Sequence, residues 1–323
     1  MGNLRDGAWT DEDTLNEDQG GKYVKVPARF RDWITADGAS GLTAEPGRYV
    51  LYSSIGCPWA HRAVLFRTLK QLEDIIPLVN TEQIEGGQGW TFPEGGHVVP
   101  GADHRAQYLH EVYTLSDPDC TSRVTVPTIW DTKKLCVVNN ESSEIIRMFN
   151  SEFIEFAPQT IDFYPEDKRT EIDEMNALVL DGVNNGVNGC GRSSSQEAYE
   201  ESFDLLFSTL DRLEEQLSGQ RYLCGDRQTE ADWRFYPNLI RFDSVYYIGY
   251  KCNLRRLEDY PNLSNYFREL YQTPRIAAIS DVEEMKRNTF GKAGPIGANG
   301  VIPKGPDLGL ERPHDRERFA AAA

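Results

Sequence analysis

Cys57 is the residue of this sequence that is best placed for nucleophilic chemistry. It stands in the run Cys57-Pro58-Trp59-Ala60, after a β-prone stretch over residues 48–52 and the turn-forming residues 53–56. From Pro58 onward apolar residues recur at helical spacing, and proline suits the first turn of a helix. The pattern therefore places Cys57 at a helix N-terminus, where unpaired backbone N–H groups and the helix dipole favour the thiolate.

The surroundings of Cys57 limit what a thiolate there can do. Ala60 stands where a second cysteine would close an internal disulfide, so a disulfide formed at Cys57 has to be resolved by an outside thiol. An inert, buried thiol is the alternative interpretation, because apolar burial disfavours the thiolate. The remaining cysteines form neither a CxxC pair nor a metal-like cluster; they are Cys120, Cys136, Cys190, Cys224 and Cys252. His97, His104 and His110 lack neighbouring cysteine ligands, and we expect no metal site.

Two further segments suit the binding of a small peptide. If the peptide bond before Pro127 is cis, the backbone groups of Val126 are exposed and pair with an extended ligand as a strand would. The helix start at Glu141-Ser142 offers N–H donors and a hydroxyl for a carboxylate, and a carboxylate for an ammonium group. Together these features suit a γ-glutamyl group.

The elements that position these residues follow a β-α-β, β-β-α order. Strands are expected over residues 48–52, 75–79, 124–130 and 135–138, and a helix with an asparagine cap is expected after Asn139-Asn140. Residues 81–120 read as a long, irregular, Gly-rich insertion. This order predicts an α/β thioredoxin-like N-terminal domain over residues 46–155, preceded by an N-terminal arm over residues 1–45.

The rest of the chain predicts an all-α C-terminal domain over residues 160–290 and a C-terminal arm over residues 291–323. Amphipathic stretches lie near residues 166–184, 196–217, 230–250 and 261–273. Thr229 and Asp232 have the spacing of a capping box, and Pro261 suits the first position of the last long helix.

Composition excludes several classes of function. The 51 acidic and 34 basic side chains give a net charge of −17, which argues against a nucleic-acid partner. No run of about 18 apolar residues spans a membrane, and the acidic first twenty residues do not resemble a secretory signal, so we expect a cytoplasmic protein. The 24 arginines and 10 lysines suit either an ordinary acidic protein or one from a salt-adapted source.

The motifs resemble those of the glutathionyl-hydroquinone reductases, also called Xi-class glutathione transferases, a branch near the Omega class. The resemblance covers residues 45–275 and the tail 300–306. It is carried by Ile55 to Arg62, Val124 to Asp131, Asn139 to Ile146, Gly225 to Arg234, and Arg241 to Asn253.

The resemblance implies the glutathione transferase architecture and a reductase in which Cys57 attacks the sulfur of a glutathionyl-hydroquinone. Glutathione, or γ-glutamylcysteine, then acts as a co-substrate, no cofactor is permanently bound, and the protein is a homodimer. The positions implied to hold the thiol peptide are Trp90, Arg123, Val126, Glu141 and Ser142.

The chain departs from the family where the quinol is expected to bind. Tyr246 matches one of the tyrosines that the family usually has in this pocket. Asn188 stands where a tyrosine usually follows Asn184 to Val187, and Asn288-Thr289-Phe290 replaces a His-Tyr-Tyr run. A lost phenol removes a possible donor to a leaving phenolate, so the substrate preference is expected to differ. Tyr246 as ordinary core packing is the alternative.

Three other functions stay open from the sequence. A glutaredoxin-like or Omega-like enzyme would use Cys57 to remove glutathione from mixed disulfides or to reduce dehydroascorbate. A conjugating transferase fits less well, because Cys57 occupies the place of its hydroxyl residue. A non-enzymatic scaffold would not be expected to keep Cys57, Val126-Pro127 and Glu141-Ser142 together.

Overall fold

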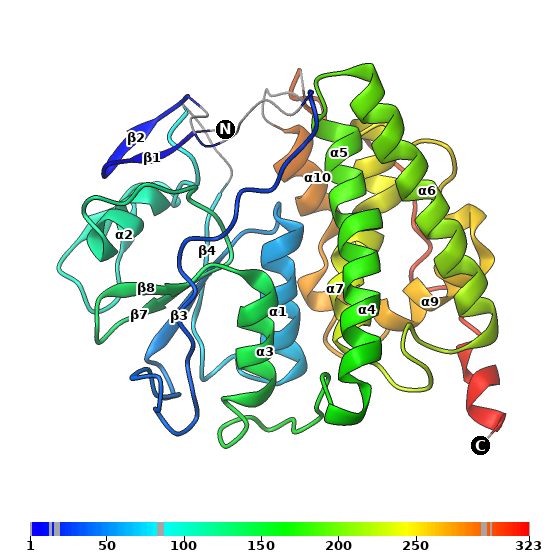
Figure 1. The fold of residues 1–323 in the computed structure, drawn as a ribbon, viewed down its shortest axis with the longest axis horizontal. Helices are drawn as coiled ribbons and strands as arrows, with labels where there is room; N and C mark the ends of the chain where they lie inside the picture. The colour runs from blue at the N-terminus through cyan, green and yellow to red at the C-terminus, as the bar shows by residue number, and fades with distance from the viewer. Residues whose placement is uncertain are drawn as a thin grey trace. The chain divides into compact units, whose positions relative to one another are not determined.

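The computed structural model describes residues 2–12, 15, 20–82, 87–291, 296, 297 and 299–322 (Figure 1). The chain divides into two compact units. The first unit comprises residues 1–17 and 26–161, and the second comprises residues 18–25 and 162–323. The segment 18–25 therefore belongs to the second unit although its neighbours in the sequence belong to the first.

A four-stranded mixed sheet forms the centre of the first unit. Its strand order is β4-β3-β7-β8, with β3 parallel to β4 and antiparallel to β7, and β7 antiparallel to β8. The strands are β3 (Tyr49–Ser53), β4 (Leu78–Asn80), β7 (Thr128–Asp131) and β8 (Cys136–Asn139). All five residues of β3 are buried, as expected of an inner strand covered on both faces. The sheet confirms the thioredoxin-like prediction for this part of the chain.

Two strands begin later than the sequence pattern predicted. The N–H groups of Ile75 and Ile76 donate to the carbonyl of Leu72 and close a turn, so β4 begins only at Leu78. Strand β7 begins at Thr128, which puts Pro127 before the strand instead of inside it. A proline inside the strand would remove a ladder donor, and this start avoids that loss.

Three helices accompany the sheet. Helices α1 (Pro58–Leu69) and α3 (Ser142–Ser151) pack against each other, and α2 (Leu109–Ser116) packs against β8 (Figure 1). The first unit also contains two hairpins, formed by β1 (Asn3–Arg5) with β2 (Ala8–Thr10) and by β5 (His97–Val98) with β6 (Arg105–Ala106).

The expectation of a wholly irregular insertion over residues 81–120 was wrong, because that stretch contains β5, β6 and α2. Leu109, Val112 and Tyr113 are fully buried at helical spacing in α2. The side chain of Glu111 accepts the backbone N–H of Tyr108 at 2.9 Å and closes the first turn. Because many glycines surround this short helix in the sequence, the helical spacing of its apolar residues was not recognised.

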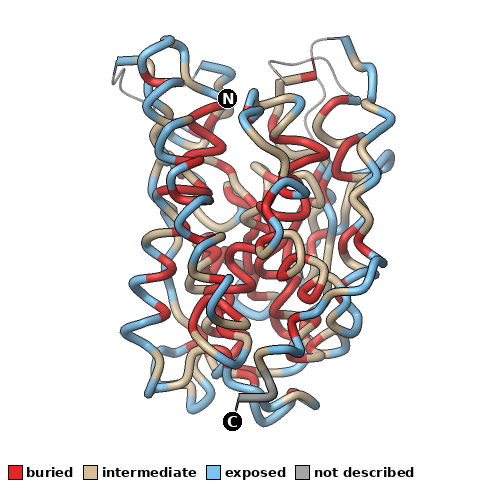
Figure 2. The backbone as a smooth tube through the Cα atoms, turned by 90° about the vertical axis from the view of Figure 1, so that its right-hand side faces the viewer, coloured by how far each residue is buried: buried red, intermediate tan, exposed pale blue. Residues whose placement is uncertain are grey.

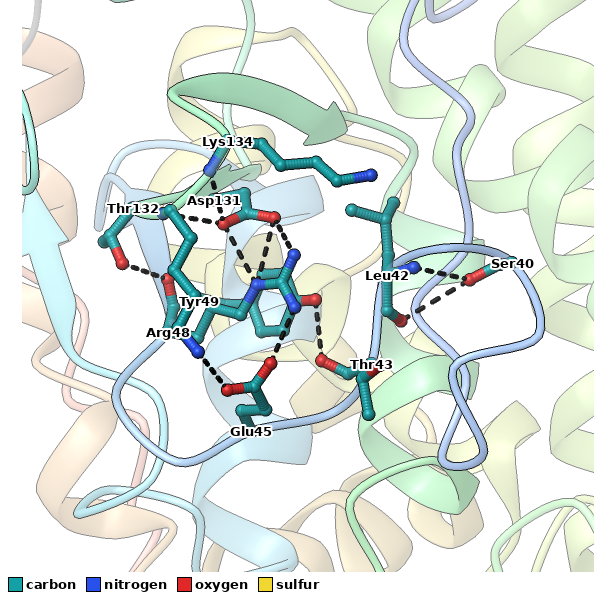
Figure 3. Close-up of polar contacts among 10 residues, drawn as sticks. Ser40, Leu42, Thr43, Glu45, Arg48, Tyr49, Asp131, Thr132 and Lys134 are labelled. Carbon is teal, nitrogen blue, oxygen red and sulfur yellow. Dashed lines mark hydrogen bonds and ion pairs between the residues drawn. The ribbon is translucent and has the colours of Figure 1, made fainter.

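A buried ion pair joins the start of β3 to the end of β7 (Figure 3). The guanidinium of Arg48 donates to both carboxylate oxygens of Asp131, at 3.1 Å from Nε and 2.6 Å from Nη2. Arg48 also donates to Glu45 at 2.7 Å, and the backbone N–H groups of Lys133 and Lys134 donate to Asp131. Asp131 is therefore paired with a charge and with backbone donors, as a fully buried carboxylate requires.

The second unit is helical, as predicted. Its helices are α4 (Arg169–Val179), α5 (Gly186–Arg192), α6 (Gln196–Gly219), α7 (Glu230–Arg241), α8 (Tyr247–Gly249), α9 (Pro261–Tyr271) and α10 (Val282–Phe290). Two π-helical segments, Leu180–Asn185 and Phe242–Tyr246, connect α4 to α5 and α7 to α8. Figure 2 shows buried positions recurring in patches along the helices, with exposed positions between them, as amphipathic helices require.

Local signals set several helix ends in the second unit. The side chain of Asp232 accepts the backbone N–H of Thr229 at 2.7 Å, which confirms the predicted capping box, and Pro261 occupies the first turn of α9. The C-terminal end of α6 is capped by a side chain that lies far away in the sequence. Arg316, which is fully buried, donates to the carbonyls of Leu217 at 2.8 Å and Arg221 at 2.7 Å and also to that of Gln220.

Candidate functional site

Cys57 is the N-cap of α1, which confirms its predicted place at a helix N-terminus. Its backbone is extended, Pro58 follows in the first turn, and the Cys57 carbonyl accepts the N–H of His61 at 3.0 Å. The thiol is half-buried and donates to the carbonyl oxygen of Val126 at 3.4 Å. The sulfur thus lies between the start of α1 and the segment that precedes β7.

Four of the other cysteines lie in environments that favour the neutral thiol. Burial raises the pKa of Cys120, Cys136 and Cys252, and it raises the pKa of Cys224 to about 12. A thiol held protonated is a poor nucleophile. Cys57 differs from these four in standing at the first turn of a helix, where backbone N–H groups are available to a thiolate.

The peptide bond between Val126 and Pro127 is cis. Val126 is buried, and its carbonyl accepts the Cys57 thiol. Within the described part of the chain, the backbone N–H of Val126 has no hydrogen-bond partner. Val126 therefore keeps the free backbone donor that strand-like pairing with an extended peptide requires.

The N-terminus of α3 also has an unused polar group. The Ser142 hydroxyl oxygen is buried and has no hydrogen-bond partner among the described residues. Glu141, and not an asparagine as predicted, is the N-cap of α3, and its side chain accepts the N–H of Ser143 at 3.2 Å. Asn139 instead accepts the N–H of Glu141 at 2.8 Å, two positions before the N-cap.

Trp90 packs against the same apolar cluster as Cys57, and Val126 is one of the buried members of that cluster. The structure therefore brings Cys57 and Val126 into contact and places Trp90 against the same apolar cluster. Arg123 is half-buried and lies three residues before Val126, in the segment that leads to the cis peptide bond. Near Cys57, the guanidinium of Arg62 lies 4.5 Å from the centroid of the Trp59 ring.

The residues predicted for the quinol pocket belong to the second unit. Tyr246 is buried, and its ring meets that of Tyr250 edge to face with centroids 5.0 Å apart. Asn188 is buried on α5 and donates to the carbonyl of Asn184 at 2.8 Å. Phe290, the last residue of α10, is buried, and its ring lies 2.8 Å from the point that a Cβ on Gly249 would occupy.

Sequence reasoning missed two polar features near these positions. Arg192 donates from Nε to the side-chain oxygen of Asn188 at 3.2 Å, and the i, i+4 spacing of the pair was the available signal. The side-chain oxygen of Asn288 is buried without a hydrogen-bond partner among the described residues. No local pattern distinguishes such an acceptor from an ordinary exposed amide.

The histidines have ordinary polar partners. His97 and Tyr52 are hydrogen-bonded at 3.1 Å, and His104 and Glu111 lie 3.2 Å apart. Among the described residues, no group of three or more His, Cys, Asp or Glu side chains is arranged to hold a metal ion. No helix in the described ranges is both long and apolar enough to cross a membrane.

Comparisons with known proteins agree with the fold and the motifs. The glutathione S-transferase N-terminal domain matches residues 56–152, and the C-terminal domain of the same family matches residues 196–269. Glutathionyl-hydroquinone reductase PcpF of Sphingobium chlorophenolicum is 44% identical over 306 residues, which cover 95% of this chain and 96% of that protein. Glutathionyl-hydroquinone reductase YqjG of Escherichia coli is 41% identical, with 98% and 99% coverage.

Solved structures place the chain in the same group. The Xi-class glutathione transferase of Natrialba magadii superposes with a TM-score of 0.89 at 38% identity and covers 99% of this chain and 97% of its own. The glutathione-bound structure of YqjG gives a TM-score of 0.86 at 39% identity, with 97% and 99% coverage. The chain therefore belongs to the glutathione transferase superfamily. Within the superfamily it is a member of the Xi class, the family of the glutathionyl-hydroquinone reductases.

Proposed function

We propose that this protein is a glutathionyl-hydroquinone reductase, an oxidoreductase that cleaves the thioether of S-glutathionyl-hydroquinones with Cys57 as the nucleophile. The observation that carries the proposal is the position of Cys57 at the N-terminus of α1, with its sulfur 3.4 Å from the Val126 carbonyl. A helix N-terminus stabilises a thiolate, and Val126 keeps a free N–H beside it for a peptide ligand.

The reaction has two steps. The Cys57 thiolate attacks the sulfur of the conjugate, an S–S bond forms and the C–S bond breaks. Before the attack the ring takes its keto form, in which a phenolic proton has moved to the ring carbon that bears the sulfur. The electron pair of the breaking C–S bond then restores the aromatic ring and shifts the carbonyl electron pair onto oxygen, so that the hydroquinone leaves as a phenolate and takes up a proton. A second thiolate then attacks the glutathionyl sulfur of the mixed disulfide, which releases oxidised glutathione and restores the Cys57 thiolate. Ala60 supplies no thiol for an internal disulfide, so the second thiol comes from solution.

The thiol peptide is held largely by backbone groups in this proposal. The N–H of Val126 pairs with the peptide backbone, and the Ser142 hydroxyl and the first N–H groups of α3 bind the γ-glutamyl carboxylate. Glu141 receives the ammonium group. Trp90 covers the peptide, and Arg123 contributes positive charge near the cis peptide bond.

The family and the composition support a proposal for the partners and the setting. The protein acts as a cytoplasmic homodimer with no permanently bound cofactor, and it takes its second thiol from the small-molecule pool. With a net charge of −17 the chain suits a salt-rich cytoplasm. In that setting γ-glutamylcysteine presents the same γ-glutamyl end as glutathione.

The test is hydroquinone release from a glutathionyl-chlorohydroquinone by the wild type and by Cys57→Ser, with glutathione and γ-glutamylcysteine supplied separately. We expect the substitution to lower the rate at least ~1,000-fold, because a serine hydroxyl ionises too weakly to attack sulfur. Mass spectrometry of the wild type should trap a glutathione adduct on Cys57, and Cys136→Ser serves as the matched control. Release that survives Cys57→Ser would refute the mechanism.

A glutaredoxin-like or dehydroascorbate-reducing activity of the same cysteine is the alternative function. Both activities begin with attack of the Cys57 thiolate and differ in the group that leaves. Turnover of a disulfide substrate or of dehydroascorbate, without hydroquinone release, would move the assignment to that alternative.

A further inference from the structure

The N-terminal hairpin of the first unit carries a tryptophan against the segment that leads to Trp90. Strands β1 and β2 pair around a two-residue turn at Asp6-Gly7, and Trp9 stands opposite Leu4 in the register. Leu4 is fully buried, and its backbone N–H and carbonyl form hydrogen bonds of 3.0 and 3.1 Å with Ser122. The hairpin is thereby fixed to the rest of the first unit, and the position of Trp9 is fixed with it.

An aromatic stack joins this hairpin to the start of α2. The ring of His110 stacks against that of Trp9, with centroids 5.1 Å apart and planes at 23°. The same histidine ring stacks against that of Tyr108, the N-cap of α2, with centroids 5.3 Å apart and planes at 11°. Trp9 is therefore held by ring contacts as well as by the strand that carries it.

The segment 87–89, which directly precedes Trp90, has little conformational preference of its own. Gly87 and Gly89 have φ angles of +84° and +79°, in a region that glycine adopts readily and other residues rarely do. Ordering such glycines costs more conformational entropy than ordering other residues. Contacts with other parts of the unit are therefore needed to hold the segment in one conformation.

Trp9 and His110 supply these contacts. Nε1 of Trp9 donates to the carbonyl of Gly87 at 2.7 Å, and the indole ring lies against buried Gly89, where a Cβ would be 2.7 Å from the ring atom Cη2. Nε2 of His110 is hydrogen-bonded to the side-chain oxygen of Gln88 at 3.1 Å. Every residue of the segment is thus in contact with Trp9 or with the histidine stacked on it.

We propose that Trp9 is a positioning residue for the thiol peptide: with His110 it holds residues 87–89 and so keeps Trp90 in the conformation that covers glutathione. This inference rests on the proposed function, which assigns Trp90 to that ligand. A binding segment that is ordered before the ligand arrives loses less conformational entropy on binding, and the affinity is higher for that reason. On its other side Trp90 is held by α2, because its carbonyl accepts the N–H of Leu109 at 2.9 Å.

The test is a double-mutant cycle on glutathione binding, measured by calorimetry with the full chain. We expect Trp9→Ala to raise the Kd for glutathione about 10-fold, but less than about 2-fold when Trp90 is already alanine. Trp9→Phe keeps a ring beside Gly89 and loses the N–H donor, so its Kd should rise only about 3-fold. Trp33→Phe, which changes a half-buried tryptophan of the same unit, is the matched control and should leave the Kd unchanged. Equal effects of Trp9→Ala in the two backgrounds would overturn the inference.

Hydrogen exchange separates positioning from a general loss of stability. In Trp9→Ala the amides of Thr91 and Leu109, which donate to the carbonyls of Glu82 and Trp90, should exchange faster, and the amides of β3 and α3 should keep the wild-type rate. Faster exchange throughout the first unit would assign Trp9 a general structural role and overturn the inference. Failure of the wild type to release a hydroquinone, with the coupling between Trp9 and Trp90 intact, would overturn the proposed function alone.

Discussion

Each unit contains a buried aspartate, and the two are stabilised in different ways. Asp131 in the first unit is paired with the guanidinium of Arg48, which together with backbone N–H groups outweighs the effect of burial and lowers its pKa. Asp243 in the second unit accepts the N–H of Leu257 at 2.7 Å, and burial raises its pKa to about 6. Backbone donors and the charge of Arg256 do not offset the desolvation of Asp243, whereas backbone donors combined with a directly bound guanidinium do so at Asp131.

The comparison predicts opposite responses to acid. A carboxylate whose folded-state pKa is lowered stabilises the fold above its unfolded pKa near 4, and that stability is lost as the pH falls. A carboxylate whose pKa is raised binds its proton more tightly in the folded state. Stability from Asp243 is therefore present at low pH and is lost as the pH rises from about 4 through about 6.

Breaking the pair in the first unit should have the largest effect. Arg48→Met leaves the Asp131 carboxylate buried without its counter-charge, and we expect a loss of about 3 to 5 kcal/mol in the free energy of unfolding. Urea titration at pH 7.5 measures this loss. The control is Arg31→Met, which breaks an exposed pair with Glu144 and should cost below about 1 kcal/mol. Equal costs for the two variants would contradict the comparison.

Replacing the aspartate of the second unit should remove a pH dependence. In Asp243→Asn the drop in unfolding free energy between pH 4.5 and 7.5 should be smaller than in the wild type by on the order of 2 to 3 kcal/mol. Urea midpoints at the two pH values give the difference. Asp181→Asn, which changes an exposed aspartate of the same unit, is the control. A variant with the same pH slope as the wild type would show that Asp243 does not carry the effect.

The smallest expected effect concerns a buried polar group that is available to a ligand, in contrast to the two aspartates, which are hydrogen-bonded within the protein. The Ser142 hydroxyl has no hydrogen-bond partner among the residues that the structure describes, so Ser142→Ala should leave stability nearly unchanged and raise the KM for glutathione about 10-fold, with little change in kcat. Steady-state kinetics at saturating conjugate measure this. Ser151→Ala, near the other end of α3, should change neither value. A loss of stability without a KM effect would assign Ser142 a structural role.

The sequence predicted the features that depend on short-range signals. Cys57 and Pro58 marked the start of α1, and Thr229 with Asp232 marked that of α7, because each signal lies within a few residues. Helix α2 was missed because its apolar residues lie in a Gly-rich stretch with no clear amphipathic pattern around them. The cap of α3 was assigned to an asparagine because Asn139, Asn140 and Glu141 are all able to cap, and only the backbone geometry selects one.

The thiol-binding part of the candidate site was more predictable than the quinol-binding part. The roles proposed for Val126-Pro127 and Glu141-Ser142 depend on backbone geometry that a few neighbouring residues encode. Tyr23 is separated from Tyr246 and Tyr250 by more than 200 residues of sequence, although all three phenols affect the pKa of Arg192. Only the folded chain brings such groups together, so a short sequence motif cannot predict them.

Because Arg316 caps the C-terminal end of α6, the folding of that helix depends on a codon far downstream in the gene. The guanidinium at position 316 supplies the donors for carbonyls about a hundred residues upstream, and burial leaves the carbonyl of Leu217 little access to water. A stop codon shortly before codon 316 would remove these donors and so destabilise a helix that is encoded about a hundred codons upstream. Selection should therefore preserve codon 316 for the folding of a segment that is translated long before it.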